Sequence, residues 1–361
     1  MTGVALSDTA AKTGPKGPQV VGQRGLNRTA VLAAAVVILF FASVLLGSYT
    51  VTVPDFFTIV ANHLTGGAKI PGASFIVMEN KLPRAVIGTM IGIAFGVAGA
   101  LFQTMLRNPL ASPDVIGISS GASAAAVVAI VVFGASGAAV SGAALAGALA
   151  VAALIYAISR GAGGTGRGNA AGNRLVLAGV GIAAALQAVV SFLMTRADIR
   201  TAADVLVWLN GSLNSATWDR AGILFPALAV LVPAAALIAG PLRILELGDD
   251  AAAGLGVRVN NVRLALVIVA VSLAAVATAA AGPVSFVAFL AGPIARRFTG
   301  KASLPASAMV GALIVLAADY FAANLAPLLL DGTVLPVGVV TGALGAPFLL
   351  WLLVTANRKD A

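Results

Sequence analysis

The feature that most constrains the fold is a series of long apolar runs that recur along almost the whole chain. Ten runs are visible, at residues 29–47, 84–106, 114–133, 138–159, 174–194, 221–240, 261–281, 283–297, 304–325 and 335–355. A helix of about 20 apolar residues crosses the hydrocarbon core of a bilayer, and most of these runs approach that length. The sequence therefore predicts an all-α polytopic membrane protein with about ten transmembrane helices.

Composition supports this prediction and excludes several other classes. The chain is 60% hydrophobic and 10% charged, whereas a soluble domain is about 45–50% apolar and about 25% charged. It has no cysteine, so a disulfide framework and a thiolate metal site are excluded, and its one histidine, His63, has no second ligand nearby. We expect no metal site and no cofactor. The net charge of +9 does not indicate a nucleic-acid partner, because the cations lie in short loops between apolar runs.

The distribution of cations predicts the orientation of the chain. Residues 1–28 are polar and basic and are predicted to be a disordered cytoplasmic N-terminus, residues 29–355 a single transmembrane domain, and residues 356–361 a cytoplasmic tail. With ten spans and a cytoplasmic N-terminus, 16 of the 22 Lys and Arg residues fall on the cytoplasmic side and the other 6 outside. This split follows the positive-inside rule, so both termini are expected in the cytoplasm.

The second apolar run and the turn after it have an unusual composition. Glycines recur every four residues from Gly88 to Gly96, and this spacing lets a neighbouring helix backbone approach closely in lipid. Prolines in the polar turn that follows predict that the helix formed by this second run ends near Arg107. Ser112 as N-cap, with Pro113 at the first helical position, is predicted to start the next helix.

The residues of this turn also carry a family resemblance. The ordered string is Gln103-x-x-x-Arg107-Asn108-Pro109-Leu110-Ala111-x-Pro113-x-x-x-Gly117. It resembles the signature of the iron–siderophore and cobalamin ABC-importer permease family, and the likeness extends over residues 81–353. The resemblance implies a type II ABC-importer permease fold that functions as a dimer. The chain itself shows no ATPase motif, so it is not expected to be an enzyme.

One predicted cytoplasmic loop, at about residues 242–260, is rich in charges of both signs. Within it the pattern predicts an Asp N-cap, one or two helical turns and a glycine stop. The pattern alone is equally typical of a helix lying at the membrane surface. However, it resembles the family loop that docks into the ATP-hydrolysing subunit. The resemblance therefore implies an ATPase-coupling loop made of Gly248, Asp249, Asp250, Ala251, Gly254, Leu255 and Gly256.

Two cations, Lys81 and Arg84, open the second span on the predicted outer side. Anchoring at the membrane interface would explain them. The family has Arg-Leu-Pro-Arg here, which pairs with acidic residues of an extracytoplasmic substrate-binding protein, so the resemblance implies a docking role. Lysine lacks the planar fork of the family's arginine. Family members also often carry an arginine where this chain has Ala323, which implies weaker docking on this side or a heterodimer with a sister permease.

An outer segment after the fifth span contains a Trp-x-x-Gly-Ser pattern. Tryptophans at an interface are ordinary membrane anchors. In the family this segment lies beside the external mouth of the translocation path, so the resemblance implies a set of possible pathway residues. These residues are Ser191, Met194, Trp208, Asn210 and Ser212.

Asp319 is the sole acid deep in a predicted span. An isolated carboxylate at the centre of a bilayer costs about 2.5–3.5 kcal/mol on insertion scales, so a partner is expected. We favour a structural hydrogen bond for Asp319. The alternative from a different class is a proton-coupled secondary transporter that uses this residue as a relay.

Taken together, the resemblance implies the permease subunit of an ATP-driven importer in a bacterial cell membrane. Its expected partners are a second permease subunit (homo- or heterodimer), two cytoplasmic ATPase subunits and an extracytoplasmic substrate-binding protein. Ferric siderophore is the expected cargo, and haem or cobalamin is the alternative.

Overall fold

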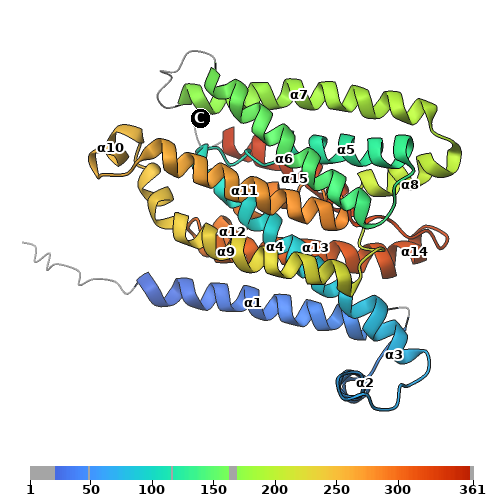
Figure 1. Ribbon diagram of the computed structural model, residues 1–361. Helices are drawn as coiled ribbons and strands as arrows, with labels where there is room; N and C mark the ends of the chain where they lie inside the picture. The colour runs from blue at the N-terminus through green and yellow to red at the C-terminus, as the bar shows by residue number, and fades with distance from the viewer. Residues whose placement is uncertain (1–20, 48, 115–116, 162–168, 358–361) are drawn as a thin grey trace, which may run out of the picture.

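The structure is a computed structural model that describes residues 21–47, 49–114, 117–161 and 169–357 (Figure 1). These residues are almost entirely helical and include no strand. The α-helices are α1 (Val21–Leu45), α2 (Val53–Thr65), α3 (Ala73–Phe75), α4 (Leu82–Met105), α5 (Ile118–Phe133), α6 (Ala138–Gly161), α7 (Asn169–Arg196), α8 (Ile199–Leu209), α9 (Trp218–Leu245), α10 (Asp249–Gly254), α11 (Val259–Ala281), α12 (Val287–Thr299), α13 (Leu304–Tyr320), α14 (Ala326–Leu329) and α15 (Val337–Asn357). Two π-helical segments, η1 (Ile76–Lys81) and η2 (Phe321–Leu325), join α3 to α4 and α13 to α14.

Every predicted span contains a helix, and the all-α polytopic architecture is confirmed. Seven helices of the described chain are long and apolar enough to cross a membrane. Helices α5 and α15 are shorter but apolar, and α12 has 13 residues. Helix α1 begins at Val21, inside the segment predicted to be disordered. The rest of that N-terminal segment and the end of the C-terminal tail lie outside the described residues.

The long helices run alongside one another with α4 near the middle (Figure 1). Helix α10 projects at one end of this bundle, and α2 and α3 lie at the opposite end. We call these the α10 end and the α2 end. Helix α4 connects them, since its first residues follow η1 at the α2 end and its last residues point toward α10.

The predicted glycine face of α4 is the contact surface for α13 and α12. A Cβ atom added to Gly92 would lie 2.6 Å from the Cα of Ala312, and one added to Gly311 would lie 2.1 Å from the carbonyl oxygen of Gly92. A Cβ on Gly99 would lie 1.8 Å from the carbonyl oxygen of Ala288 in α12. The backbones therefore touch directly, which is how helices pack where lipid offers no hydrophobic drive.

The apolar run 283–297 has a Gly-Pro pair at its start, Gly282-Pro283, and another inside it, Gly292-Pro293, and only the first pair interrupts the helix. Residues 282–286 separate α11 from α12, whereas Gly292-Pro293 lies inside a continuous α12. Pro293 has no N–H, so the carbonyl of Phe289 one turn earlier loses its helical donor. The amide Nε2 of Gln103 donates to this carbonyl at 3.0 Å. Gly292 leaves room for it, because a Cβ there would lie 1.9 Å from Gln103 Oε1. A signature residue of α4 therefore stabilises the proline-containing helix.

Candidate functional site

The end of α4 has an arginine where glycine is usual. The backbone N–H of Arg107 donates to the carbonyl of Thr104 at 3.2 Å, and that of Asn108 donates to Gln103 at 3.0 Å. This pair of bonds is the Schellman motif, which places the residue after the C-cap in the left-handed region. Arg107 accordingly has a φ of 50°. For a residue with a side chain this conformation costs about 1–2 kcal/mol.

The rest of the signature turn is organised by its asparagine and by Gly117. The side-chain oxygen of Asn108 accepts from the backbone N–H of Leu110 at 2.9 Å, and the Asn108 carbonyl accepts from Ala111 at 3.1 Å. The prediction that Ser112 and Pro113 start the next helix is wrong. These bonds hold the chain in an extended turn, and α5 begins only after Gly117, whose φ of 86° lets the chain enter the helix.

Asp114 follows Pro113 in this turn, and one of its carboxylate oxygens is buried. Asp114 accepts a hydrogen bond from the hydroxyl of Ser119. Burial raises the pKa of Asp114, and the bond from Ser119 acts against that change. The turn is therefore closed onto the start of α5 by a side chain as well as by the backbone.

The side chain of Arg107 joins the signature turn to the predicted coupling loop. Its Nη2 donates to the carbonyl of Leu245, the last residue of α9, at 2.5 Å. The same nitrogen lies 3.4 Å from Oδ1 of Asp249. Nη2 of Arg263, in α11, lies 2.9 Å from the same carboxylate oxygen. We call Arg107, Asp249 and Arg263 the Asp249 cluster.

The predicted capping role of Asp249 is wrong. Gly248 is the N-cap residue of α10, with a φ of 114°, and no side chain caps this helix. Asp249 is the first helical residue, and its carboxylate is occupied by the two arginines. The predicted glycine stop is confirmed, because Gly256 has a φ of 84° and its N–H donates to Ala253 at 3.0 Å.

Helix α10 has two different faces. Asp249 and Ala252 face the bundle, with Ala252 fully buried and the Asp249 side chain 18% exposed. Asp250 is exposed, together with Ala251, Gly254 and Leu255. The exposed face is small and apolar apart from one carboxylate, so it is available to another protein.

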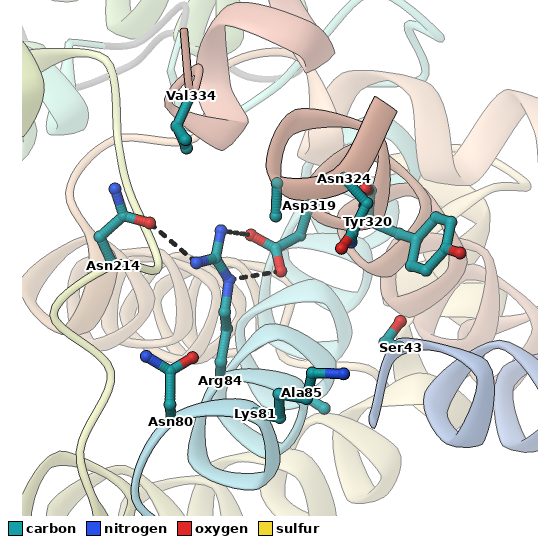
Figure 2. Close-up of a pocket in the computed structure, with 11 residues that line it drawn as sticks. Ser43, Asn80, Lys81, Arg84, Ala85, Asn214, Asp319, Tyr320, Asn324 and Val334 are labelled. Carbon is teal, nitrogen blue, oxygen red and sulfur yellow. Dashed lines mark hydrogen bonds and ion pairs between the residues drawn. The ribbon is translucent and has the colours of Figure 1, made fainter. Parts of the chain in front are cut away.

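A second charged group lies at the α2 end of the bundle. Arg84, near the start of α4, grips Asp319 of α13 with two bonds, Nε to Oδ2 and Nη2 to Oδ1, both 2.8 Å long. Nη1 of Arg84 donates to Oδ1 of Asn214 at 2.8 Å. Figure 2 shows the guanidinium held between these two partners. We call Arg84, Asp319 and Asn214 the Arg84 cluster. Asp319 therefore has the partner that its depth in a span required.

The Arg84 cluster lines a cavity of about 290 Å³ (Figure 2). Lys81 also lines it, and the Lys81 ammonium donates to the carbonyls of Leu46, at 2.8 Å, and Tyr49. Ala323, where the family often has an arginine, is part of the same wall. The structure thus brings the two predicted docking cations to one cavity, with their donors bonded inside the chain. Their docking role stays a prediction.

Comparison with known proteins identifies the family. The sequence matches the FecCD transport family over residues 35–355. The chain belongs to this family. It is 40% identical over 288 residues to the ferric enterobactin transport system permease protein FepG of Escherichia coli (strain K12), covering 79% of this chain and 84% of FepG. It is 34% identical over 344 residues to the Fe(3+)-citrate import system permease protein YfmE of Bacillus subtilis (strain 168), covering 94% of this chain and 98% of YfmE.

A solved structure has the same fold. It is described as an inward-facing conformation of a transporter of the metal-chelate ABC type. Its TM-score is 0.76 at 23% identity, covering 91% of this chain and 99% of that chain. The chain is thus a multi-pass membrane permease of the FecCD transport family.

In this FecCD-family permease, three of the predicted pathway residues lie at a backbone crossing. The N–H of Ser212 donates to the carbonyl of Ala281 at 2.8 Å. A Cβ on Gly282 would lie 2.4 Å from the carbonyl oxygen of Trp208, and one on Gly338 would lie 1.7 Å from that of Asn210. The segment after α8 is therefore packed against the α11–α12 connection and the start of α15.

The other two predicted pathway residues lie on α7. Met194 packs against the buried cluster that contains Val127 and Val205, and Ser191 is exposed. The structure does not gather all five residues into one site, and their pathway role remains a prediction.

Sequence reasoning missed two members of the charged groups. Arg263 lies in α11, just beyond the predicted coupling loop, and its charge, opposite to that of the coupling acids, was a usable signal. The role of Asn214 could not be predicted from the sequence, because a single asparagine in a loop is ordinary.

Proposed function

We propose that this permease is the transmembrane subunit of an ATP-driven importer and forms a gated path for ferric siderophores. The observation that carries the proposal is the family match over nearly the whole apolar part of the chain. The chain makes and breaks no bond in this role. It binds partners, and its helices alternate between two packings.

The cargo is inferred from the relatives. FepG is named for ferric enterobactin and YfmE for Fe(3+)-citrate, and both are chelates of ferric iron. This supports an iron chelate over haem or cobalamin for the present chain, and a ferric siderophore is the proposed member of that class.

The two ends of the bundle receive different partners. We place the α10 end in the cytoplasm, together with both termini, in a bacterial cell membrane. The excess of cations in the segments assigned to that side supports this orientation. Two ATPase subunits bind at the exposed face of α10 and its counterpart in a second permease subunit. A substrate-binding protein docks at the α2 end, near Lys81 and Arg84.

The second permease subunit completes the path, because one chain forms only half of a dimeric permease. Ala323 supports a heterodimer. A sister permease with an arginine at that place would supply the missing cation for docking on its own half.

Reconstitution tests the proposal. The chain, its companion subunits and the binding protein are placed in liposomes, and uptake of a radiolabelled ferric siderophore is measured with and without internal ATP. Uptake is expected only with ATP and all subunits. Cargo movement by the purified chain alone, driven by a pH gradient, would contradict it.

One variant separates the importer from a proton-coupled carrier. Asp319→Asn keeps a hydrogen-bond acceptor for Arg84, so the importer is expected to keep ATP-dependent uptake wherever it assembles. Loss of uptake with assembly and ATPase stimulation intact would instead favour a relay role for Asp319. The bidentate pairing of Asp319 with Arg84 supports the structural role.

A further inference from the structure

The two adjacent acids of α10 have different surroundings. Asp249 is 18% exposed and its carboxylate is bonded to arginines from two other parts of the chain. Asp250 is exposed, and its neighbours on the free face are Ala251 and Leu255. A docked partner can therefore reach Asp250 directly, whereas it reaches Asp249 only by breaking bonds within the permease.

We propose that Asp249 is a positioning residue that transmits movement of α10 to α4 and α11, and that Asp250 is the acid that contacts the ATPase. This inference rests on the proposed function, because it divides the predicted coupling residues into those that touch the partner and those that pass its movement on. The linkage runs from Asp249 to Arg107 at the end of α4 and to Arg263 in α11.

The short length of α10 makes such a linkage necessary. A helix of six residues is too short to be stable by itself, so other contacts must fix its position. Ala252 is its one buried side chain, and an alanine methyl group contributes little packing. The Asp249 cluster is therefore a principal constraint on α10. Without the cluster, a partner could displace α10 and leave α4 where it was.

The backbone of Arg107 points to the same conclusion. The left-handed conformation of Arg107 favours glycine, so an arginine at this position carries a conformational cost that glycine would not. What the side chain supplies is contact with the last carbonyl of α9 and the first residue of α10. One guanidinium thus spans the whole connection between these helices and attaches it to α4.

A matched pair of variants tests the division of roles. Asp249→Asn and Asp250→Asn are each prepared in the full complex, and three quantities are measured: the amount of ATPase that co-purifies, the ATPase rate, and cargo taken up per ATP hydrolysed. For Asp249→Asn we expect co-purification within about twofold of wild type and uptake per ATP about tenfold lower, since mutations along coupling networks change coupling by roughly twofold to thirtyfold. For Asp250→Asn we expect less co-purifying ATPase, with uptake per ATP in the assembled fraction unchanged.

Variants of the two arginines test the same linkage independently, in case Asp249→Asn does not fold. Arg107→Gly retains the turn, because glycine suits the left-handed position, but removes both side-chain contacts. Arg263→Met retains the apolar stem and removes the shorter ion pair. Both are expected to lower uptake per ATP, and Arg107→Gly combined with Asp249→Asn is expected to lower it no further than either alone. Asp249→Glu, which keeps the charge, is expected to restore part of the coupling.

The outcomes are separable. Equal loss of co-purifying ATPase in Asp249→Asn and Asp250→Asn would overturn the inference, as would wild-type uptake per ATP in Arg107→Gly. Either result leaves the proposed function standing. Failure of the proposed function appears instead in the wild-type complex, as uptake that needs neither ATP nor an ATPase subunit.

Discussion

Helix α4 is associated with an arginine at each end, and the two arginines are held differently. Arg84 makes a two-bond contact with Asp319, and the two side chains are 17% and 9% exposed. Arg107 shares one carboxylate oxygen with Arg263, at the longer distance of 3.4 Å, and its side chain is 40% exposed. The contact of Arg84 is a buried ion pair between two spans. The contact of Arg107 is longer and more exposed to solvent, so it can rearrange more easily.

The difference follows from what each arginine joins. Arg84 connects α4 to α13, whose backbones already touch along the glycine face. Arg107 connects α4 to a six-residue helix with one buried side chain. A buried ion pair is costly to break, because each unpaired charge is left without solvent, whereas an exposed pair is worth about 0–1 kcal/mol. The α2 end is thus expected to resist change and the α10 end to permit it.

The largest expected effect is on stability at the Arg84 cluster. Asp319→Ala leaves the largely buried Arg84 guanidinium without its counter-ion, which is expected to cost about 3–5 kcal/mol. Thermal unfolding of the purified protein in detergent measures this loss. A double change of Arg84→Met with Asp319→Leu is the control, since it leaves no unpaired charge and should cost less than Asp319→Ala alone. A greater loss of stability in the double variant would contradict the assignment of the Asp319→Ala effect to an unpaired buried charge.

The next effect tests whether α4 is stiff between its two arginines. Gly92→Ala places a methyl group 2.6 Å from the Cα of Ala312, and such overpacking typically costs about 1–3 kcal/mol. Gly142→Ala in α6 is the matched control, because no heavy atom lies within 4 Å of its Cβ position. Thermal unfolding should separate the two variants. Equal behaviour would mean that α4 and α13 can move apart freely.

A smaller effect concerns docking at the α2 end. Arg84→Gln combined with Asp319→Asn removes both charges without leaving either one unpaired. If Arg84 attracts acidic residues of the binding protein, the dissociation constant should rise about tenfold, by surface plasmon resonance on the complex in nanodiscs. Asp319→Asn alone keeps the cation and serves as the control. An unaltered constant in the double variant would remove Arg84 from the docking surface.

The smallest effect is on the stability of the α10 end. Asp249→Asn removes the charge from a partly exposed contact, so its cost is expected to be about 1 kcal/mol or less and to shrink further in high salt. Thermal unfolding at low and high ionic strength measures both. A loss as large as that of Asp319→Ala would erase the contrast between the two clusters.

The sequence predicted the spans well because their signal is local. Run length and hydropathy need no knowledge of neighbours, and the same holds for the stop at Gly256, where the positive φ favours glycine. It failed for Asp249, because Gly248 takes the N-cap position and the carboxylate of Asp249 is bonded to Arg263 in the next helix. The continuity of α12 through Pro293 likewise depends on another helix, because a side chain of α4 donates to the carbonyl that the proline leaves without a donor.

The charged pairs could not be predicted as pairs. Arg84 and Asp319 are 235 residues apart in sequence, and the chain has 22 Lys and Arg residues that could supply the counter-ion of Asp319. Only the crossing of α4 and α13 determines which cation is near. The need for a partner was predictable from the cost of a lone charge in lipid, but its identity was not.

The bond from Gln103 to the carbonyl of Phe289 limits how the protein can switch between its states. If α12 slid away from α4, that carbonyl would face hydrocarbon with no donor, at a cost of several kcal/mol. If the protein transports as proposed, we therefore expect α4 and α12, together with α13, which contacts α4 along its glycine face, to move as one rigid body. The hinges of the transport cycle are to be sought at the edges of this three-helix body.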